Sequence, residues 1–197
     1  MFTGIVTDLG KVRAIRDGTV RRLEIATAYE TGDIALGASV ACNGCCLSVV
    51  EKGPGWLAFE AAQETLAVTT LRDWQPGTEV NLERPMKIGD ELGGHIVAGH
   101  VDGIGTVTRA VEDGGSLRLT VEAPENLAKY IASKGSVTID GVSLTVNEVA
   151  GNSFGVCLIP ITQEATNLGR ARSGQRVNLE IDLIARYVAR LLGQDGK

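Results

Sequence analysis

The sequence has no long apolar run and no cluster of basic residues. No segment approaches the roughly eighteen consecutive apolar side chains of a membrane-spanning helix, and the N-terminus lacks the basic flank and apolar stretch of a secretory signal. The 19 Lys and Arg are scattered and are outnumbered by 24 Asp and Glu, which gives a net charge of −5. This charge disfavours both nucleic acids and membranes as partners. We therefore expect a cytoplasmic protein whose ligand is a small molecule.

Cysteine is also scarce, with four in 197 residues. In the cytosol we expect these side chains to be thiols. Cys42 and Cys45 form a Cys-x-x-Cys pair, but a structural zinc site needs four ligands. The remaining candidates are Cys46, Cys157 and two His, and a strand-like run follows the pair where a thioredoxin-like site would need a helix. The pattern disfavours a metal site and a redox site.

The sequence does contain an internal duplication. Residues 42–50 recur with substitutions as residues 139–147, at a shift of 97 positions. The register continues without a gap for some forty residues and closes on Val-Asn-Leu-Glu in both copies. Upstream, at a shift of 95, residues 4–6 and 10–12 recur as residues 99–101 and 105–107. This period is far longer than that of a solenoid repeat, so each copy is expected to be a whole domain.

The pattern within each copy predicts an all-β fold. Short apolar-rich runs are bounded by Gly, Asp and Thr, and 25 glycines against five prolines favour many tight turns. About six short strands in each copy indicate a small closed Greek-key barrel. The strands expected in the first copy are 4–12, 21–26, 38–43, 45–50, 56–60 and 79–84. We expect a helical turn within residues 63–71 and a short helix within residues 123–131.

One segment, residues 182–192, has no counterpart in the first copy. Its apolar residues fall at helical spacing on one face, with Arg186 and Arg190 opposite. The apolar face consists of Ile184, Tyr187, Val188, Leu191 and Leu192. Such a face must be buried, either on the protein's own barrel or against copies of itself in an oligomer. The expected domains are therefore a first barrel over residues 1–95, a second barrel over 96–183, and an oligomerisation helix and tail over 184–197.

The opening residues 1–6, the paired motifs 44–49 and 141–146, and the segment 93–101 together resemble the riboflavin synthases of the duplicated lumazine-binding type. The resemblance covers essentially the whole chain. It implies two tandem six-stranded antiparallel Greek-key barrels, each binding one 6,7-dimethyl-8-ribityllumazine, and a C-terminal helix that gathers three chains into a homotrimer.

The implied activity is that of a transferase in riboflavin biosynthesis. One lumazine gives a four-carbon unit to the other, which yields riboflavin and 5-amino-6-(ribitylamino)uracil. The resemblance implies no cofactor, and lumazine synthase is a candidate partner.

The two copies differ at positions where chemistry can reside. Two identical substrates with unequal roles require two similar but unequal pockets, and holding both in a productive orientation supplies much of the catalysis. The differing pairs are Cys46 and Ser143, Ser48 and Thr145, and Ile5 and His100. These differences fall on groups able to act as a nucleophile, a hydrogen-bond donor or a base.

The resemblance also implies which residues form the site. The expected catalytic residues are Cys46, His100, Ser143, Thr145 and Asp182. Substrate contacts are expected from Gly4, Ile5, Val6, Cys46, Leu47, Ser48, Glu60, Ala61, Ala62, Gln63, Glu64 and Thr65 in the first copy, and from Gly99, His100, Val101, Lys134, Ser143, Leu144, Thr145, Ile159, Pro160, Ile161, Thr162, Gln163 and Glu164 in the second. We expect His100 to be a base beside Ser143 and Thr145 in the second barrel, and Cys46 to be a nucleophile or a hydroxide-orienting group in the first. The sequence does not say which barrel binds the donor and which the acceptor. The pocket is expected between the first barrel of one subunit and the second barrel of a neighbour.

Each of these residues has a simpler structural interpretation. Cys46 can be a small buried side chain, His100 a structural histidine five residues after His95, Asp182 the N-cap of the last helix, and Lys134 a turn residue. Ser143 and Thr145 can be ordinary strand residues.

Two other classes of function remain. A lumazine- or flavin-binding protein without catalysis would use the same fold, and a generic interaction module would use the same barrels. The reactive set Cys46, His100, Ser143 and Thr145 is complete, which favours the enzyme. An interaction module would leave the polar differences between the copies without purpose.

Overall fold

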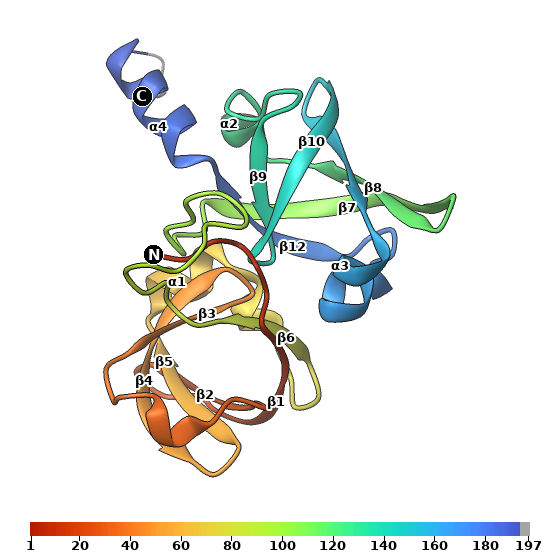
Figure 1. The fold of residues 1–197 in the computed structure, drawn as a ribbon. Helices are drawn as coiled ribbons and strands as arrows, with labels where there is room; N and C mark the ends of the chain where they lie inside the picture. The colour runs from red at the N-terminus through yellow and green to blue at the C-terminus, as the bar shows by residue number, and fades with distance from the viewer. Residues whose placement is uncertain (194–197) are drawn as a thin grey trace.

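The computed structural model describes residues 1–193 and contains two closed β-barrels followed by a helix (Figure 1). The strand order is β1-β2-β5-β4-β3-β6 in the first barrel, and the same order of corresponding strands closes the second. All neighbouring strands are antiparallel. The predicted pair of six-stranded antiparallel barrels is confirmed.

The strands of the first barrel are β1 (Asp8–Arg16), β2 (Arg21–Ala26), β3 (Ser39–Cys42), β4 (Cys45–Gly53), β5 (Trp56–Ala61) and β6 (Glu79–Glu83). Those of the second are β7 (Gly103–Asp113), β8 (Ser116–Glu122), β9 (Ser136–Ile139), β10 (Val142–Ala150), β11 (Ser153–Leu158) and β12 (Arg176–Ile181). The helices are η1 (Thr31–Asp33), α1 (Gln63–Val68), η2 (Thr70–Asp73), α2 (Glu125–Ala128), α3 (Pro160–Ala165), η3 (Asn167–Arg170) and α4 (Leu183–Leu191).

Each barrel has its own apolar core, because side chains alternate between the inside and the outside of each strand. In β2, for example, Leu23 and Ile25 are fully buried. Phe59 of the first barrel and Phe154 of the second are among the largest fully buried side chains, and burial of each contributes about 1.5–3 kcal/mol.

The barrels dock through a contact, here called the seam, that surrounds Gly44 and Gly141. Both glycines have a positive φ, and a Cβ added to Gly44 would lie 2.8 Å from the backbone nitrogen of Gly141. Around them, the side-chain amide of Asn81 donates to the carbonyl of Asp140 at 2.8 Å, and that of Asn178 donates to the carbonyl of Asn43 at 2.9 Å. These bonds are equivalent under the 97-residue shift, so the two barrels are related by an approximate twofold axis.

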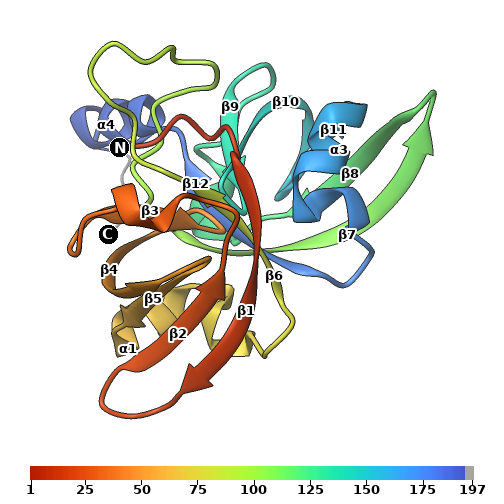
Figure 2. The ribbon, with the colours of Figure 1, turned by 60° about the horizontal axis from the view of Figure 1, so that its bottom comes forward.

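The first strand begins later than predicted. The sequence favoured a strand from residue 4, but β1 starts at Asp8. Residues before it leave the first barrel, because the Gly4 carbonyl accepts a hydrogen bond from the backbone N–H of Ser143 in β10 at 2.8 Å. Figure 2 shows this N-terminal segment, in red, passing along the second barrel before β1 begins.

Helix α4 extends from the end of β12, and its apolar face is uncovered in the single chain (Figure 1). Ile184, Tyr187 and Leu191 are 70%, 62% and 87% exposed. The face therefore does not dock on the protein's own barrel, which was one of its two predicted destinations.

Residues 194–197 of the predicted tail lie outside the described part of the chain. Among the helices of residues 1–193, none is long and apolar enough to cross a membrane.

Candidate functional site

The segments that precede β1 and β7 are exchanged between the barrels. Each is anchored at its own barrel by a buried glutamate: Glu83 accepts from the backbone N–H groups of Thr3 and Gly4 at 2.6 and 3.0 Å. Glu180 accepts from those of Ala98 and Gly99 at 2.7 and 3.0 Å. Burial raises the pKa of both carboxyl groups.

Each anchored segment then lies along the opposite barrel. The Gly99 carbonyl accepts from the backbone N–H of Cys46 in β4 at 2.8 Å, as the Gly4 carbonyl does from Ser143. Val6 packs against the core of the second barrel, and Val101 against the core of the first. Residues 4–6 therefore belong spatially to the second barrel, and residues 99–101 to the first.

This exchange corrects the predicted grouping of the catalytic residues. His100 was expected beside Ser143 and Thr145 in the second barrel, but its neighbour Gly99 is bonded to Cys46 of the first barrel. The prediction failed because it assigned His100 by its place in the chain. His100 lies between Gly99, which is bonded to Cys46, and Val101, which packs on the core of the first barrel.

The first site, as we define it, is the outer face of β4 with the segments beside it. Cys46 is half-buried and its thiol is free, while Ser48 and His100 are exposed. Gly99 has φ +80, and a Cβ there would lie 2.7 Å from the Cβ of Cys46, so the close approach requires glycine. The register pairs Val49 of β4 with Phe59 of β5, and residues 60–65 continue the chain directly after Phe59.

Within the first site, side chains differ in accessibility. Leu47 and Ala61 are buried, whereas Glu60, Ala62, Gln63 and Glu64 are exposed and Thr65 is half-buried. Any contact from Leu47 to a ligand would therefore come from its backbone. Ile5, by contrast, is exposed near the second barrel.

The second site is the corresponding face of β10. Ser143 is half-buried and Thr145, two residues later on the same face, is exposed. The Oγ of Ser143 lies 2.7 Å from Nδ1 of His95, and the Nε2 of His95 lies 3.2 Å from the Oγ1 of Thr138. Burial lowers the pKa of His95, and the nearby charge of Asp182 opposes this in part. Burial thus favours a neutral imidazole held between two hydroxyl groups.

His95 was not among the predicted site residues. Comparison of the copies cannot find it, because at the shift of 95 it corresponds to a position before Met1. The available signal was its place in the segment 93–101, which the resemblance had already singled out.

The remaining predicted residues of the second copy lie around β10. Lys134 is an exposed turn residue with φ 64 whose N–H donates to the carbonyl of Val146 at 2.8 Å. Asp182 is the N-cap of α4, since its Oδ1 accepts from the N–H of Ile184 at 2.8 Å. Leu144 is buried, while residues 159–164 are exposed or half-buried and include Gln163, which donates to the carbonyl of Leu158 at 2.9 Å.

The two faces are open surfaces in the single chain. A groove of about 610 Å³ along the seam and another of about 590 Å³ beside Ile5 are lined by neither Cys46, His100 nor Ser143. Within residues 1–193, no group of three or more His, Cys, Asp or Glu side chains is arranged to hold a metal ion.

The chain matches known proteins over nearly its full length. The model of the lumazine binding domain matches twice, at residues 3–85 and 98–182. The riboflavin synthase of Brucella abortus (strain 2308) is 50% identical over 97% of this chain and 98% of the relative, and that of Mycobacterium tuberculosis (strain H37Rv) is 43% identical over the whole of both. Among solved structures, LumP complexed with riboflavin superposes with a TM-score of 0.84 at 28% identity, covering 92% of this chain and 99% of that one. LumP complexed with 6,7-dimethyl-8-(1'-D-ribityl) lumazine gives 0.82 at 27%.

Proposed function

The chain belongs to the lumazine-binding family, and from this premise we propose that it catalyses the riboflavin synthase reaction. Two molecules of 6,7-dimethyl-8-ribityllumazine react, and a four-carbon unit passes from one to the other. The products are riboflavin and 5-amino-6-(ribitylamino)uracil. The observation that supports this most strongly is the 50% identity with a riboflavin synthase over 97% of this chain.

The paired sites suit a reaction between two identical molecules. Each barrel presents the outer face of an equivalent strand, bordered by a segment exchanged from the other copy. Because the donor and the acceptor must behave differently, the sites need different side chains, and the thiol of Cys46 faces the first site where Ser143 faces the second. We assign the orientation of both substrates to these faces.

We assign His100 as the base that removes a proton from the C7 methyl group of one lumazine. Its side chain is exposed, and its neighbour Gly99 is bonded to Cys46. Imidazole is the side chain best suited to proton transfer near neutral pH. Cys46 is the nucleophile or hydrogen-bonding group of the same site. In the second site, Ser143 and Thr145 hydrogen-bond to the other lumazine, and His95 orients the Ser143 hydroxyl. Asp182 and Lys134 border this site.

We propose that the active form is a homotrimer in which the first barrel of one subunit faces the second barrel of a neighbour. The apolar face of α4 is uncovered in the single chain, and burying it requires another molecule. Ser48, His100 and Thr145 are exposed in the single chain, and a neighbouring barrel would cover them. In this arrangement residues 1–95 and 96–183 are the two lumazine-binding units, and residues 184–193 of the last domain hold the assembly together. Lumazine synthase is a candidate partner.

A lumazine- or flavin-binding protein without catalysis is the second candidate. The superposition on LumP, whose structures contain riboflavin and a ribityllumazine, supports binding of such ligands. The enzyme is favoured because the identity to riboflavin synthases is higher and because Cys46, His100, Ser143 and Thr145 are all present.

One experiment separates the two candidates. Purified protein is incubated with the lumazine, and riboflavin is followed by absorbance while the pyrimidine product is quantified. The enzyme yields one riboflavin for every two lumazines consumed. Tight binding of lumazine without turnover, under conditions in which a bacterial riboflavin synthase is active, would establish the binding protein instead.

A further inference from the structure

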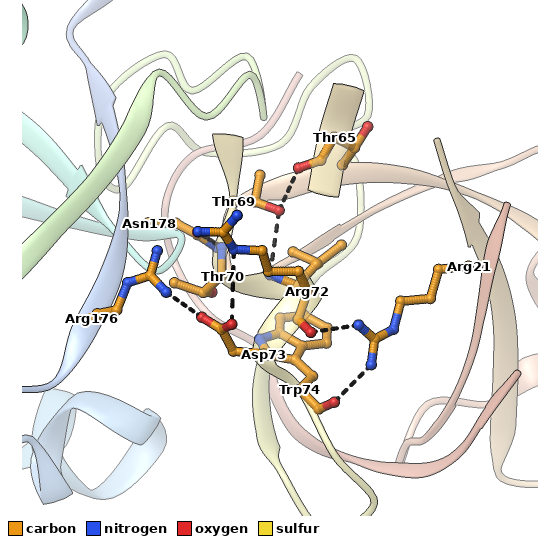
Figure 3. Close-up of polar contacts among 10 residues, drawn as sticks. Arg21, Thr65, Thr69, Thr70, Arg72, Asp73, Trp74, Arg176 and Asn178 are labelled. Atoms are coloured by element: carbon orange, nitrogen blue, oxygen red, sulfur yellow. Dashed lines mark hydrogen bonds and ion pairs between the residues drawn. The ribbon is translucent and has the colours of Figure 1, made fainter. Parts of the chain in front are cut away.

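Two ion pairs cross the seam with the same polarity. Arg176 of β12 points toward Asp73 of η2 and pairs with it at 2.5 Å (Figure 3). Arg170 of η3 pairs with Glu79 of β6 at 2.8 Å. In both pairs the first barrel supplies the acid and the second supplies the base.

The two ion pairs are images of each other under the 97-residue repeat. Asp73 in the first copy corresponds to Arg170 in the second, and Glu79 corresponds to Arg176. The approximate twofold axis therefore places one pair on the other with the charges reversed. A seam between two first copies would set Asp73 against Glu79 twice. A seam between two second copies would set Arg170 against Arg176 twice.

The contacts at the centre of the seam do not discriminate in this way. Gly44 and Gly141 are the same residue type at equivalent positions, and so are Asn81 and Asn178. Two first copies, or two second copies, would make these contacts equally well. The charges are therefore a feature that distinguishes the correct partner from a wrong one.

We propose that these ion pairs select the partner of each barrel. A first barrel accepts a second barrel on its seam and rejects another first barrel, because like charges at both positions oppose the wrong pairing. A chain whose barrels choose each other in this way closes on itself. Chains that are crowded during assembly are thereby kept from pairing like barrels between molecules.

The size of the effect is limited by solvent. The four side chains are between 33% and 63% exposed, so salt screens the pairs, and exposed pairs of this kind are individually weak. Local opening of the seam is therefore a more sensitive measure than global unfolding. Two backbone amides report it directly: the N–H of Thr70 donates to the side chain of Asn178, and that of Asn167 donates to the side chain of Asn81, each at 2.8 Å.

The repeat itself supplies the test substitutions. Asp73→Arg with Glu79→Arg gives the first barrel the residues of the second, and Arg170→Asp with Arg176→Glu does the reverse. Combining all four restores opposite charges with their positions exchanged. The full-length variants are compared by hydrogen exchange at the amides of Thr70 and Asn167, and at strand β2 as a measure of the intact barrel.

Each double variant is expected to accelerate exchange at both seam amides about tenfold at low salt, with β2 unchanged, and the fourfold variant is expected to return close to the wild-type rate. The acceleration should shrink at about 1 M salt, where the Debye length is about 3 Å. The control is Glu51→Arg with Glu148→Arg, which changes the net charge as much as Asp73→Arg with Glu79→Arg. This control places a positive charge beside Arg22 in the first barrel and beside Arg118 in the second. It should leave the exchange rates of the seam amides unchanged.

Double variants that exchange at the wild-type rate would overturn the proposal. So would a fourfold variant that exchanges as fast as the doubles, since complementarity would then be irrelevant. If a double variant does not fold, the fourfold variant decides. It must fold with protected seam amides, and its failure to do so overturns the proposal.

Discussion

Nδ1 of His95 lies 2.7 Å from the hydroxyl oxygen of Ser143, so a residue of the inter-barrel connection holds the central side chain of the second site. The opposite ring nitrogen meets Thr138, and the His95 N–H donates to the carbonyl of Thr3 at 3.1 Å. The ring is thus held between two hydroxyl groups of the second barrel, while the backbone of His95 is held by the N-terminal segment. A neutral imidazole in this position can accept from the Ser143 hydroxyl or donate to it, which sets the direction in which that hydroxyl points.

We predict that His95→Ala lowers kcat about tenfold, the rate equivalent of one lost neutral hydrogen bond. Riboflavin formation measured by absorbance gives the rate. His95→Asn places a polar atom near the position of Nδ1 and should recover part of it. If His95 acts through Ser143, the loss becomes small when His95→Ala is made in a Ser143→Ala background. Equal losses in both backgrounds would show that His95 acts independently of this hydroxyl.

His100→Gln should lower kcat by about 10²-fold, the usual contribution of a positioned base. Cys46→Ser, in the same site, should keep part of the rate because a hydroxyl replaces the thiol at similar reach. Both variants should still bind riboflavin, which fluorescence titration checks. An unchanged rate and an unchanged pH profile in His100→Gln would remove His100 from the mechanism and make Asp182 the next base to test.

The barrels could be predicted from the sequence because their causes are local. Alternating apolar residues such as Leu23 and Ile25 define a strand with one buried face, and the repeat doubles the evidence for each strand. The apolar face of α4 was equally visible in the spacing of Ile184, Val188 and Leu191. The exposure of this face in the single chain could not be predicted, because the spacing of residues shows which of them share a face but not what covers that face.

The exchange of the segments before β1 and β7 could not be predicted in the same way. It depends on how the two folded barrels dock around Gly44 and Gly141, and the periodicity of the strands does not predict that docking. His100 was therefore assigned to the wrong barrel although its residue type was correctly singled out. Glu83 and Glu180 anchor the exchanged segments. In the sequence they stand out only as the last residue of the repeated Val-Asn-Leu-Glu motif, which does not indicate this anchoring role.

Gly99→Ala is expected to destabilise the protein and impair the first site. The substitution forces alanine into φ +80 and places its Cβ 2.7 Å from the Cβ of Cys46, so backbone must move. Gly77→Ala is the matched control, with φ +96 and open space around it, and should cost about 1–2 kcal/mol from the backbone alone. Urea unfolding should show a clearly larger loss for Gly99→Ala. Equal losses would mean that the segment moves away freely.

Assembly through α4 can be tested by placing charge on its apolar face. If the protein is the proposed trimer, Ile184→Glu with Leu191→Glu should convert it to monomers, because two carboxylates cannot be buried unpaired in an apolar contact. Turnover should fall with it, since each site would lose the barrel of its neighbour. Ile88→Glu, at a fully exposed apolar residue between the barrels, is the control and should leave the sedimentation coefficient unchanged. A wild-type protein that sediments as a monomer at working concentration would contradict the proposed trimer.

The last prediction concerns Asp140, the residue of the seam that corresponds to Asn43 in the first copy. Burial raises the pKa of its carboxyl group to about 7, although bonds from Asn178 and Asn167 lower it in part. Because the folded pKa lies above the ordinary value of about 3.9, the folded state binds a proton that the unfolded chain has lost across this interval. The contribution of Asp140 to stability is therefore complete below about pH 4 and declines as the pH rises to about 7.

Asp140→Asn should remove this decline. Asparagine keeps the oxygen that accepts from the Asn178 N–H at 2.8 Å, and the neighbouring copy shows that it tolerates the left-handed backbone, with φ 44 at Asn43 and 46 at Asp140. Unfolding free energies measured by urea from pH 4 to 8 should match the wild type at the acid end. Above pH 7 the variant should be more stable, by at most about 4 kcal/mol for a shift of this size. A constant difference across the whole range would mean that Asp140 does not titrate there, and its carboxyl group would then be ionised in the folded seam.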